Sequence, residues 1–142
     1  MSSAGQQLIA GRVPGERIAT TVATSNSAAI TTTDTIVDSV VAALVSGRTY
    51  RITFASNMSG AAINDRGIFR IREDNVTGTQ LGFARITVPV ATLYPIRGEA
   101  EYTAVATGNK TFVVTLIREV GTVTRAASAT IPTYLYVDYI RG

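Results

Sequence analysis

Hydrophobic and polar side chains alternate along much of this chain. In the segment RTYRITFA, the apolar residues Tyr50, Ile52 and Phe54 fall on one face, while arginine and threonine fall on the other. In GIFRIRE, Phe69 and Ile71 oppose arginines in the same way. A period of two residues is typical of a β-strand with one buried side. We therefore expect these arginines to point away from a hydrophobic core.

Nine segments rich in Val, Ile, Thr, Tyr and Phe recur along the chain, separated by Gly, Asn, Asp or Ser. The expected strands are Arg17–Thr24, Thr35–Leu44, Arg48–Ala55, Arg66–Glu73, Gln80–Val88, Arg97–Ala106, Lys110–Glu119, Gly121–Ala127 and Thr133–Ile140. Strands at this spacing are typical of all-β sandwiches and barrels. The sequence therefore predicts an all-β fold, an antiparallel two-sheet β-sandwich of the jelly-roll type.

Two stretches leave an alternative open. DTIVDSVVAAL, residues 34–44, places apolar residues at spacings that a helix could also use, but its β-branched content favours a strand. Pro89 and Pro95 cannot donate to a strand ladder. We therefore expect the fifth strand to end near Val88, and residues 90–95 to form a loop or a sheet edge.

Two connections contain residues typical of tight turns. REDNVTGTQ, residues 72–80, predicts a hairpin between the fourth and fifth strands. Its adjacent acids lack the ligand spacing of a Ca²⁺ loop, so we interpret them as part of a solvated turn. ATGNK, residues 106–110, predicts a hairpin between the sixth and seventh strands, since Gly108 and Asn109 tolerate positive φ angles.

The composition limits the chemistry that the protein can perform. Its 142 residues fit a single domain. There is no Cys and no His, so the chain lacks thiol nucleophiles, disulfides, the commonest general base and the commonest transition-metal ligand. We expect a non-enzymatic protein without a catalytic residue, a metal or a cofactor.

Glu99 and Glu101 are the acids that most resemble a catalytic pair, because residues two apart on a strand share a face. Catalytic carboxylates, however, flank a substrate across a cleft, about 5–9 Å apart. Two acids on one strand are more typical partners of basic side chains on an adjacent strand. We expect them to pair with Lys110, Arg118 or Arg97.

The net charge of +3 comes from 12 Arg and one Lys against ten acids. The arginines are spread from Arg12 to Arg141, whereas nucleic-acid binding proteins cluster their basic residues. Arginine also suits protein interfaces. The sequence has no signal-peptide pattern and no apolar run of about 18–20 residues. We expect neither a nucleic acid nor a membrane as partner.

The last predicted strand contains several tyrosines. In TYLYVDYI, Tyr134, Tyr136 and Asp138 share one face, while Leu135 and Val137 share the other. If one face belongs to the core, the other presents tyrosine outward, where it suits sugar stacking or a subunit interface. A central strand covered on both faces is the open alternative.

The first 16 residues form neither a good helix nor a good strand, since GQQLIAGRVPG mixes apolar residues with Gly and Pro. An apolar segment that cannot bury itself locally gains order by adding to another surface. We therefore divide the chain into an extended N-terminal arm, residues 1–16, and a single sandwich domain, residues 17–142. The partner-binding residues that we expect are the apolar Leu8, Ile9, Val13 and Pro14 and the basic Arg12 and Arg17.

Four segments resemble a known group of proteins: GRTYRITF, IREDNVTGTQLGFARI, EYTAVATGNKTFVVTLIRE and PTYLYVDYIRG. They look like small β-sandwich virion structural proteins of actinobacterial bacteriophages, of the head decoration or minor tail type. The similarity covers most of residues 17–142. Because none of these segments is a catalytic motif, the resemblance implies membership of a particle.

The resemblance implies a capsid decoration protein that binds the assembled shell through its N-terminal arm. Its partners would be the major capsid protein or other virion proteins, and it would form a homo-oligomer, with a trimer preferred. It would be made in the host cytoplasm and reside on the capsid surface of the virion. The alternative is a minor tail or receptor-binding module that recognises host-surface glycans through Tyr134 and Tyr136.

Overall fold

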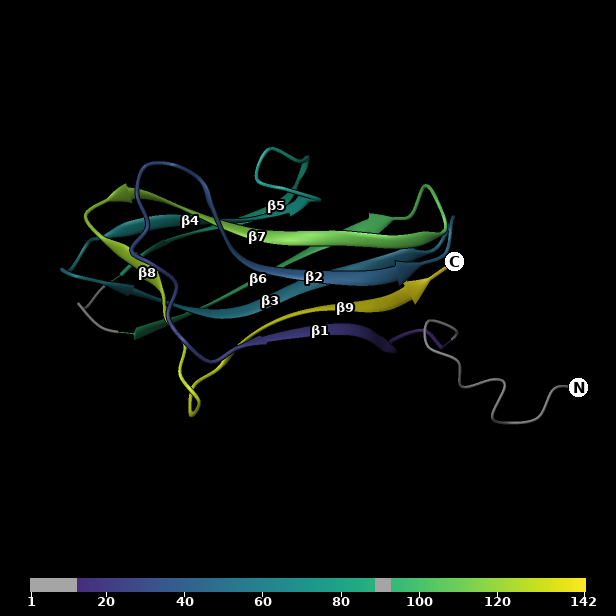
Figure 1. Ribbon diagram of the computed structural model, residues 1–142, viewed down its shortest axis with the longest axis horizontal. Helices are drawn as coiled ribbons and strands as arrows, with labels where there is room; N and C mark the ends of the chain where they lie inside the picture. Colours follow the sequence, from purple (N-terminus) through teal and green to yellow (C-terminus); the bar gives the residue numbers. More distant parts are fainter. Residues whose placement is uncertain (1–12, 89–92) are drawn as a thin grey trace, which may run out of the picture.

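The chain folds into two antiparallel β-sheets packed face to face, as Figure 1 shows. The computed structural model describes residues 13–88 and 93–142, and every regular element within these ranges is a strand. The strands are β1 (Arg17–Ala23), β2 (Thr35–Leu44), β3 (Thr49–Gly60), β4 (Arg66–Glu73), β5 (Gln80–Thr87), β6 (Leu93–Thr103), β7 (Gly108–Val120), β8 (Val123–Arg125) and β9 (Thr133–Arg141). The predicted all-β sandwich is confirmed.

The strands divide into two sheets that we name A and B. Sheet A has the order β1-β9-β3-β6, with the short β8 also paired to β3, and sheet B has the order β2-β7-β4-β5. The chain changes sheet at most connections, so strands distant in sequence become neighbours. Interleaving of this kind closes a jelly-roll sandwich.

The core lies between the inner faces of the two sheets. Tyr50, Ile52 and Phe54 of β3 are at most 1% exposed, as their alternation predicts. The rings of Phe54 in sheet A and Phe69 in sheet B stack with their centroids 5.3 Å apart. The inward side chains of both sheets thus interdigitate in a single core.

Several strand boundaries follow the sequence closely. Residues 35–44 form β2, so the helical alternative for that stretch is excluded. β6 begins at Leu93 and contains Pro95, which is tolerated because β6 lies at one end of sheet A. β3 continues to Gly60, five residues beyond the predicted end, and buries Met58 completely.

One of the two predicted hairpins is present. β4 and β5 pair directly, and Asp74 in their connection adopts a φ of 65°. The hairpin predicted at residues 106–110 is wrong, because β6 pairs with β3 whereas β7 pairs with β2 and β4. The turn residues permit a tight reversal there, but packing assigns the two strands to different sheets.

A buried arginine ties the two sheets together. Arg125 of β8 lies 3.5 Å from Asp38 of β2, measured from Nε to Oδ2, and both side chains are only 7% exposed. Its other nitrogens donate to the backbone carbonyls of Ser25 and Val37. Val37 lies in a bulge of β2, which turns its carbonyl toward the arginine. Burial raises the pKa of Asp38 to about 6, against the opposing effect of Arg125.

Asp65 organises two loops at one end of the sandwich. One carboxylate oxygen accepts hydrogen bonds from the backbone amides of Ala61, Ala62 and Thr122, at 2.8, 3.0 and 3.2 Å. These amides, with Ala62 contributing most, hold the pKa of Asp65 below its usual value. The carboxylate therefore holds the β3–β4 loop and the β7–β8 loop together at this end of the sandwich.

Candidate functional site

The outer face of sheet A carries the tyrosines that the sequence singled out. Strand register aligns its outward side chains in three rows that run from β1 across β9 and β3 to β6. The rows are Val22–Tyr134–Ala55–Arg97, Thr20–Tyr136–Thr53–Glu99 and Arg17–Asp138–Arg51–Glu101. The face is therefore apolar at one end and charged at the other.

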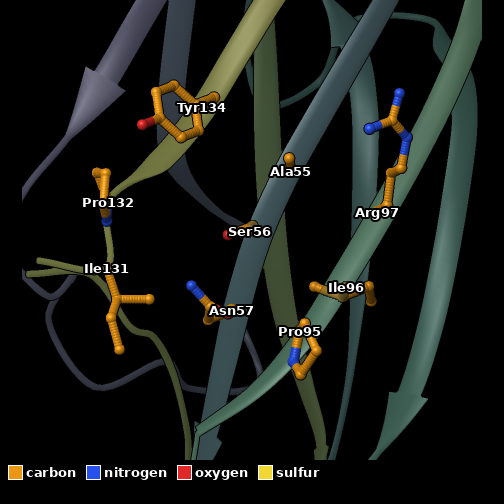
Figure 2. Close-up of a pocket in the computed structure, with 9 residues that line it drawn as sticks. All are labelled: Ala55, Ser56, Asn57, Pro95, Ile96, Arg97, Ile131, Pro132 and Tyr134. Carbon is orange, nitrogen blue, oxygen red and sulfur yellow. The ribbon is translucent and has the colours of Figure 1, made fainter.

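A groove of about 390 Å³ lies at the apolar end of this face. Residues 55–57 of β3 form its floor, residues 95–97 of β6 form one side, and Ile131, Pro132 and Tyr134 form the other (Figure 2). Tyr134 is 41% exposed and Ile131 is 48% exposed. The groove thus combines apolar walls with an open tyrosine ring, a composition typical of ligand and protein contact sites.

Two polar residues of β3 line the floor of the groove. Ser56 is 5% exposed and shares the inward face of β3 with Phe54 and Met58, and its buried hydroxyl has no hydrogen-bond partner within the described part of the chain. Asn57 is 8% exposed, and Figure 2 shows its amide directed toward the side formed by Ile131 and Pro132. Asn57 shares the outward face of β3 with Ala55, so its amide is the side-chain group of the two that is suited to bonding with something that enters the groove.

Tyr136 is covered by arginines and not by another layer of the fold. The guanidinium carbon of Arg17 lies 3.5 Å from the centre of its ring, and Arg97 donates a 3.2 Å hydrogen bond to its hydroxyl. Arg17 also donates to Asp138 at 3.0 Å, which raises the pKa of the guanidinium. Tyr136 is only 9% exposed, whereas the inward Leu135 is in the core. Tyr134 is therefore the outward tyrosine that remains open.

The strand-face acids are engaged in ion pairs, as expected. Glu101 lies 3.6 Å from Arg51 and 3.1 Å from Arg141, and Glu99 lies 3.7 Å from Arg97. The expected partner Arg97 is confirmed, although it lies on β6 itself, and the partner on an adjacent strand is Arg51 of β3. The expectation for Lys110 and Arg118 is wrong, because both belong to β7 in the other sheet.

The acids of the turn at residues 72–80 hold the lysine of the chain. Lys110 lies 2.8 Å from Glu73 and 3.0 Å from Asp74, and these contacts, led by Glu73, raise its pKa. Across residues 13–88 and 93–142, no group of three or more acids is placed to hold a metal ion. No helix in those ranges is long and apolar enough to cross a membrane.

The predicted arm is described only at its end. Leu8, Ile9 and Arg12 lie outside the described residues. Val13 and Pro14 are exposed and lead into a turn in which the Glu16 amide donates to the Val13 carbonyl at 3.0 Å. Arg17 is already engaged by Asp138 and Tyr136 of its own chain. Partner binding by these residues stays a prediction.

Sequence reasoning missed most of the residues that form the groove. Ser56 and Asn57 were placed beyond the end of the predicted third strand, although the stretch through Met58 continues the alternation. Ile131 and Pro132 come just before β9 in a stretch of Ser, Ala and Thr. Their apolar character in that setting was the available signal, but only the pairing of β3 with β6 and β9 brings the three segments together.

Comparison with known proteins supports the fold. No protein-family model and no characterised protein matches the sequence. The chain is similar in structure to Eiger TNF from S. frugiperda, with 9% identity over 89% of this chain and 94% of that one, and a TM-score of 0.53. The globular domain of zebrafish complement 1qA protein matches with 11% identity over 88% and 99%, and a TM-score of 0.51. Both similarities show a shared jelly-roll fold.

The matching structures also include carbohydrate-binding modules. A family 6 carbohydrate-binding module shares 13% identity with this chain over 86% of its length and 94% of the module, with a TM-score of 0.42.

Proposed function

We propose that this protein is a non-enzymatic structural subunit of a bacteriophage particle, and specifically a decoration protein on the capsid surface. The resemblance described above suggests the particle. The observation that carries the role of a subunit is the exposed apolar end of sheet A, where Tyr134 and Ile131 border an open groove. Exposed apolar surface of this kind marks sites of association.

The acids of the chain support a structural role. Asp34 pairs with Arg72 at 2.9 Å, and Glu119 pairs with Arg85 at 2.9 Å, in the same manner as the strand-face acids described above. Asp65 is held by backbone amides. Carboxylates engaged in this way hold parts of the fold together. General acid–base catalysis needs a group within reach of a substrate proton, so these acids are better suited to a structural role than to catalysis.

The mechanism of a decoration protein is mass action. A protein that binds the assembled shell but not the loosened shell stabilises the assembled form by its binding free energy. We expect the major capsid protein as partner, with Leu8, Ile9, Val13 and Pro14 as arm anchors and a homo-oligomer, preferably a trimer, as the bound form. Synthesis in the host cytoplasm would precede attachment.

The test is binding to purified shells that lack this protein. Full-length protein is expected to co-sediment with shells in tens to hundreds of copies per particle, measured by quantitative mass spectrometry. A variant without residues 1–16 is expected to keep its circular dichroism spectrum and lose binding. A copy number matching a single tail ring would contradict the decoration role, and binding by the truncated variant would contradict the role of the arm.

The second candidate function is recognition of a glycan by the groove. The Tyr134 ring and the Asn57 amide both line the groove, and sugars combine an apolar ring face with hydroxyl groups (Figure 2). A glycan array distinguishes the two functions. Glycan recognition predicts a signal that Tyr134→Ala removes and that Phe83→Ala, on the outer face of sheet B, retains.

A further inference from the structure

We propose that the outer face of sheet A packs against a second copy of this chain. This inference rests on the proposed role as a subunit and names the surface through which the subunits meet. Three independent observations on the face support it: a continuous apolar area, an alternating row of charges and a set of side chains already held in place.

The apolar area is larger than the groove alone. A second hollow of about 280 Å³, bordered by Leu93 and Ala127, shares Ile131 with the groove. Val22, opposite Tyr134 in the strand register, is 49% exposed. The exposed apolar side chains therefore form one connected surface, unlike the scattered single residues that are ordinary on soluble proteins.

A short turn presents Ile131 at the boundary of the two hollows. The Ser128 amide donates to the Ile131 carbonyl, and the Ile131 amide donates to the Ser128 hydroxyl, both at 3.0 Å. The turn thus holds an apolar side chain out from the surface beside two hollows. A fixed apolar projection next to a recess is typical of the centre of protein interfaces.

The charges at the other end of the face favour a second copy as the partner. Across the face, Arg17, Asp138, Arg51 and Glu101 alternate in sign. A second copy whose row runs in the opposite direction places every cation opposite an anion. A uniformly charged partner such as a nucleic acid would meet repelling groups at every second position.

Two arginines of the face already have partners within the chain. Arg17 is held by Asp138 and by the ring of Tyr136, and Arg97 by the Tyr136 hydroxyl. Association therefore immobilises few additional rotamers. Tyrosine and arginine are also the residue types enriched in protein interfaces, where lysine is depleted.

Sheet B provides matched controls. Phe83 on β5 is 64% exposed and Val41 on β2 is 56% exposed, both on the outer face. β5 and β2 lie at opposite ends of the sheet order, so these side chains do not form one surface. Substitutions at Phe83 and Val41 therefore change exposure and charge in the same way as those at Tyr134 and Val22, but away from the proposed interface.

The experiment measures the mass of the full chain in solution by sedimentation equilibrium and light scattering, up to about 100 µM, where micromolar association is complete. Wild-type protein is expected at a multiple of its 15.0 kDa chain mass. Tyr134→Arg and Val22→Glu are expected to weaken association at least about tenfold. Phe83→Arg and Val41→Glu are expected to leave it unchanged, and thermal melting confirms that all four variants fold.

Three outcomes overturn the inference. They are a wild-type mass of 15.0 kDa at every concentration, equal weakening by the control substitutions, and wild-type association in folded Tyr134→Arg and Val22→Glu. Failure of the proposed function gives a different result, because an oligomer that does not bind shells contradicts the decoration role alone.

Discussion

Gly121 and Asp65 fit together without room for a further atom between them. A Cβ atom at position 121, where φ is +69°, would overlap the Asp65 carboxylate. That carboxylate connects the loop at residues 61–65 with the loop at residues 121–122. Close packing of Gly121 on Asp65 therefore connects two loops that are distant in the sequence.

Removing the Asp65 carboxylate should destabilise the fold. We expect Asp65→Ala to lower the free energy of unfolding, because three backbone amides lose a charged acceptor. Gly121→Ala should also destabilise the fold, through overlap of the added Cβ atom with the carboxylate. Urea unfolding at pH 7 measures both changes. A double variant close to the sum of the two single effects would contradict the coupling of the two positions.

The lowered pKa of Asp65 also makes the stability of the fold depend on pH. A carboxyl whose pKa is lower in the folded state contributes stability above its unfolded pKa, near 4, and this contribution is lost as the pH falls below that value. Asp65→Asn should therefore reduce the acid sensitivity of unfolding below about pH 4. If the variant loses stability below about pH 4 as steeply as the wild type, the acid sensitivity does not come from Asp65.

Asp38 should produce the opposite pH dependence. Its pKa in the folded state, about 6, is higher than the ordinary value of 3.8, so the folded protein binds the proton more tightly than the unfolded chain. Stability should fall as the pH rises from about 4 to about 6, by up to about 3 kcal/mol. The chain has no histidine to titrate in the same range.

The control for this prediction is Asp38→Asn, which does not titrate. Chemical unfolding at half-unit pH steps should show the decrease in the wild type and not in the variant. The same decrease in both proteins would assign it to another group.

Gly98 of β6 is expected to tolerate no side chain. It lies opposite Phe54 in the strand register, and a Cβ atom would overlap the Phe54 ring. We expect Gly98→Ala to lower the thermal midpoint and to destabilise by about 1–3 kcal/mol. In the background of Phe54→Leu, the same substitution should have a smaller effect, and an equal effect would contradict the ring contact.

Ser56 should behave unlike most buried polar residues. Its hydroxyl has no partner within residues 13–88 and 93–142. Ser56→Ala therefore removes a polar group whose burial without a hydrogen bond lowers the stability of the fold. We expect the isolated chain to gain up to about 1 kcal/mol of stability. Thermal unfolding measures the gain, and a marked destabilisation would contradict the absence of a partner.

The fold followed from the sequence because strands with one buried face leave a two-residue alternation. β2 and β4 have the predicted bounds, and the inward and outward faces of β9 separate as TYLYVDYI predicts. The connection before β7 was mispredicted because Gly108 and Asn109 report local backbone freedom, whereas sheet membership depends on contacts with β2 and β4. Local chemistry cannot distinguish these arrangements.

The candidate site was predictable only in part. Tyr134 was identified from the alternation of its strand. Ser56 and Arg97 became groove residues because β3 lies between β9 and β6, an arrangement that no short-range pattern encodes. Of the predicted arm anchors, Leu8 and Ile9 lie outside the described residues, so their role depends on the truncation experiment.

The pairing of β1 with β9 imposes an order on folding. Arg17 and Asp138, 121 positions apart, are partners in the ladder, and β1 pairs with no other strand in the described sheets. During synthesis, β1 therefore has no ladder partner for its backbone amides until the ribosome has synthesised residues 133–141. Closing so long a loop slows folding. A chaperone that binds nascent chains would therefore bind this strand.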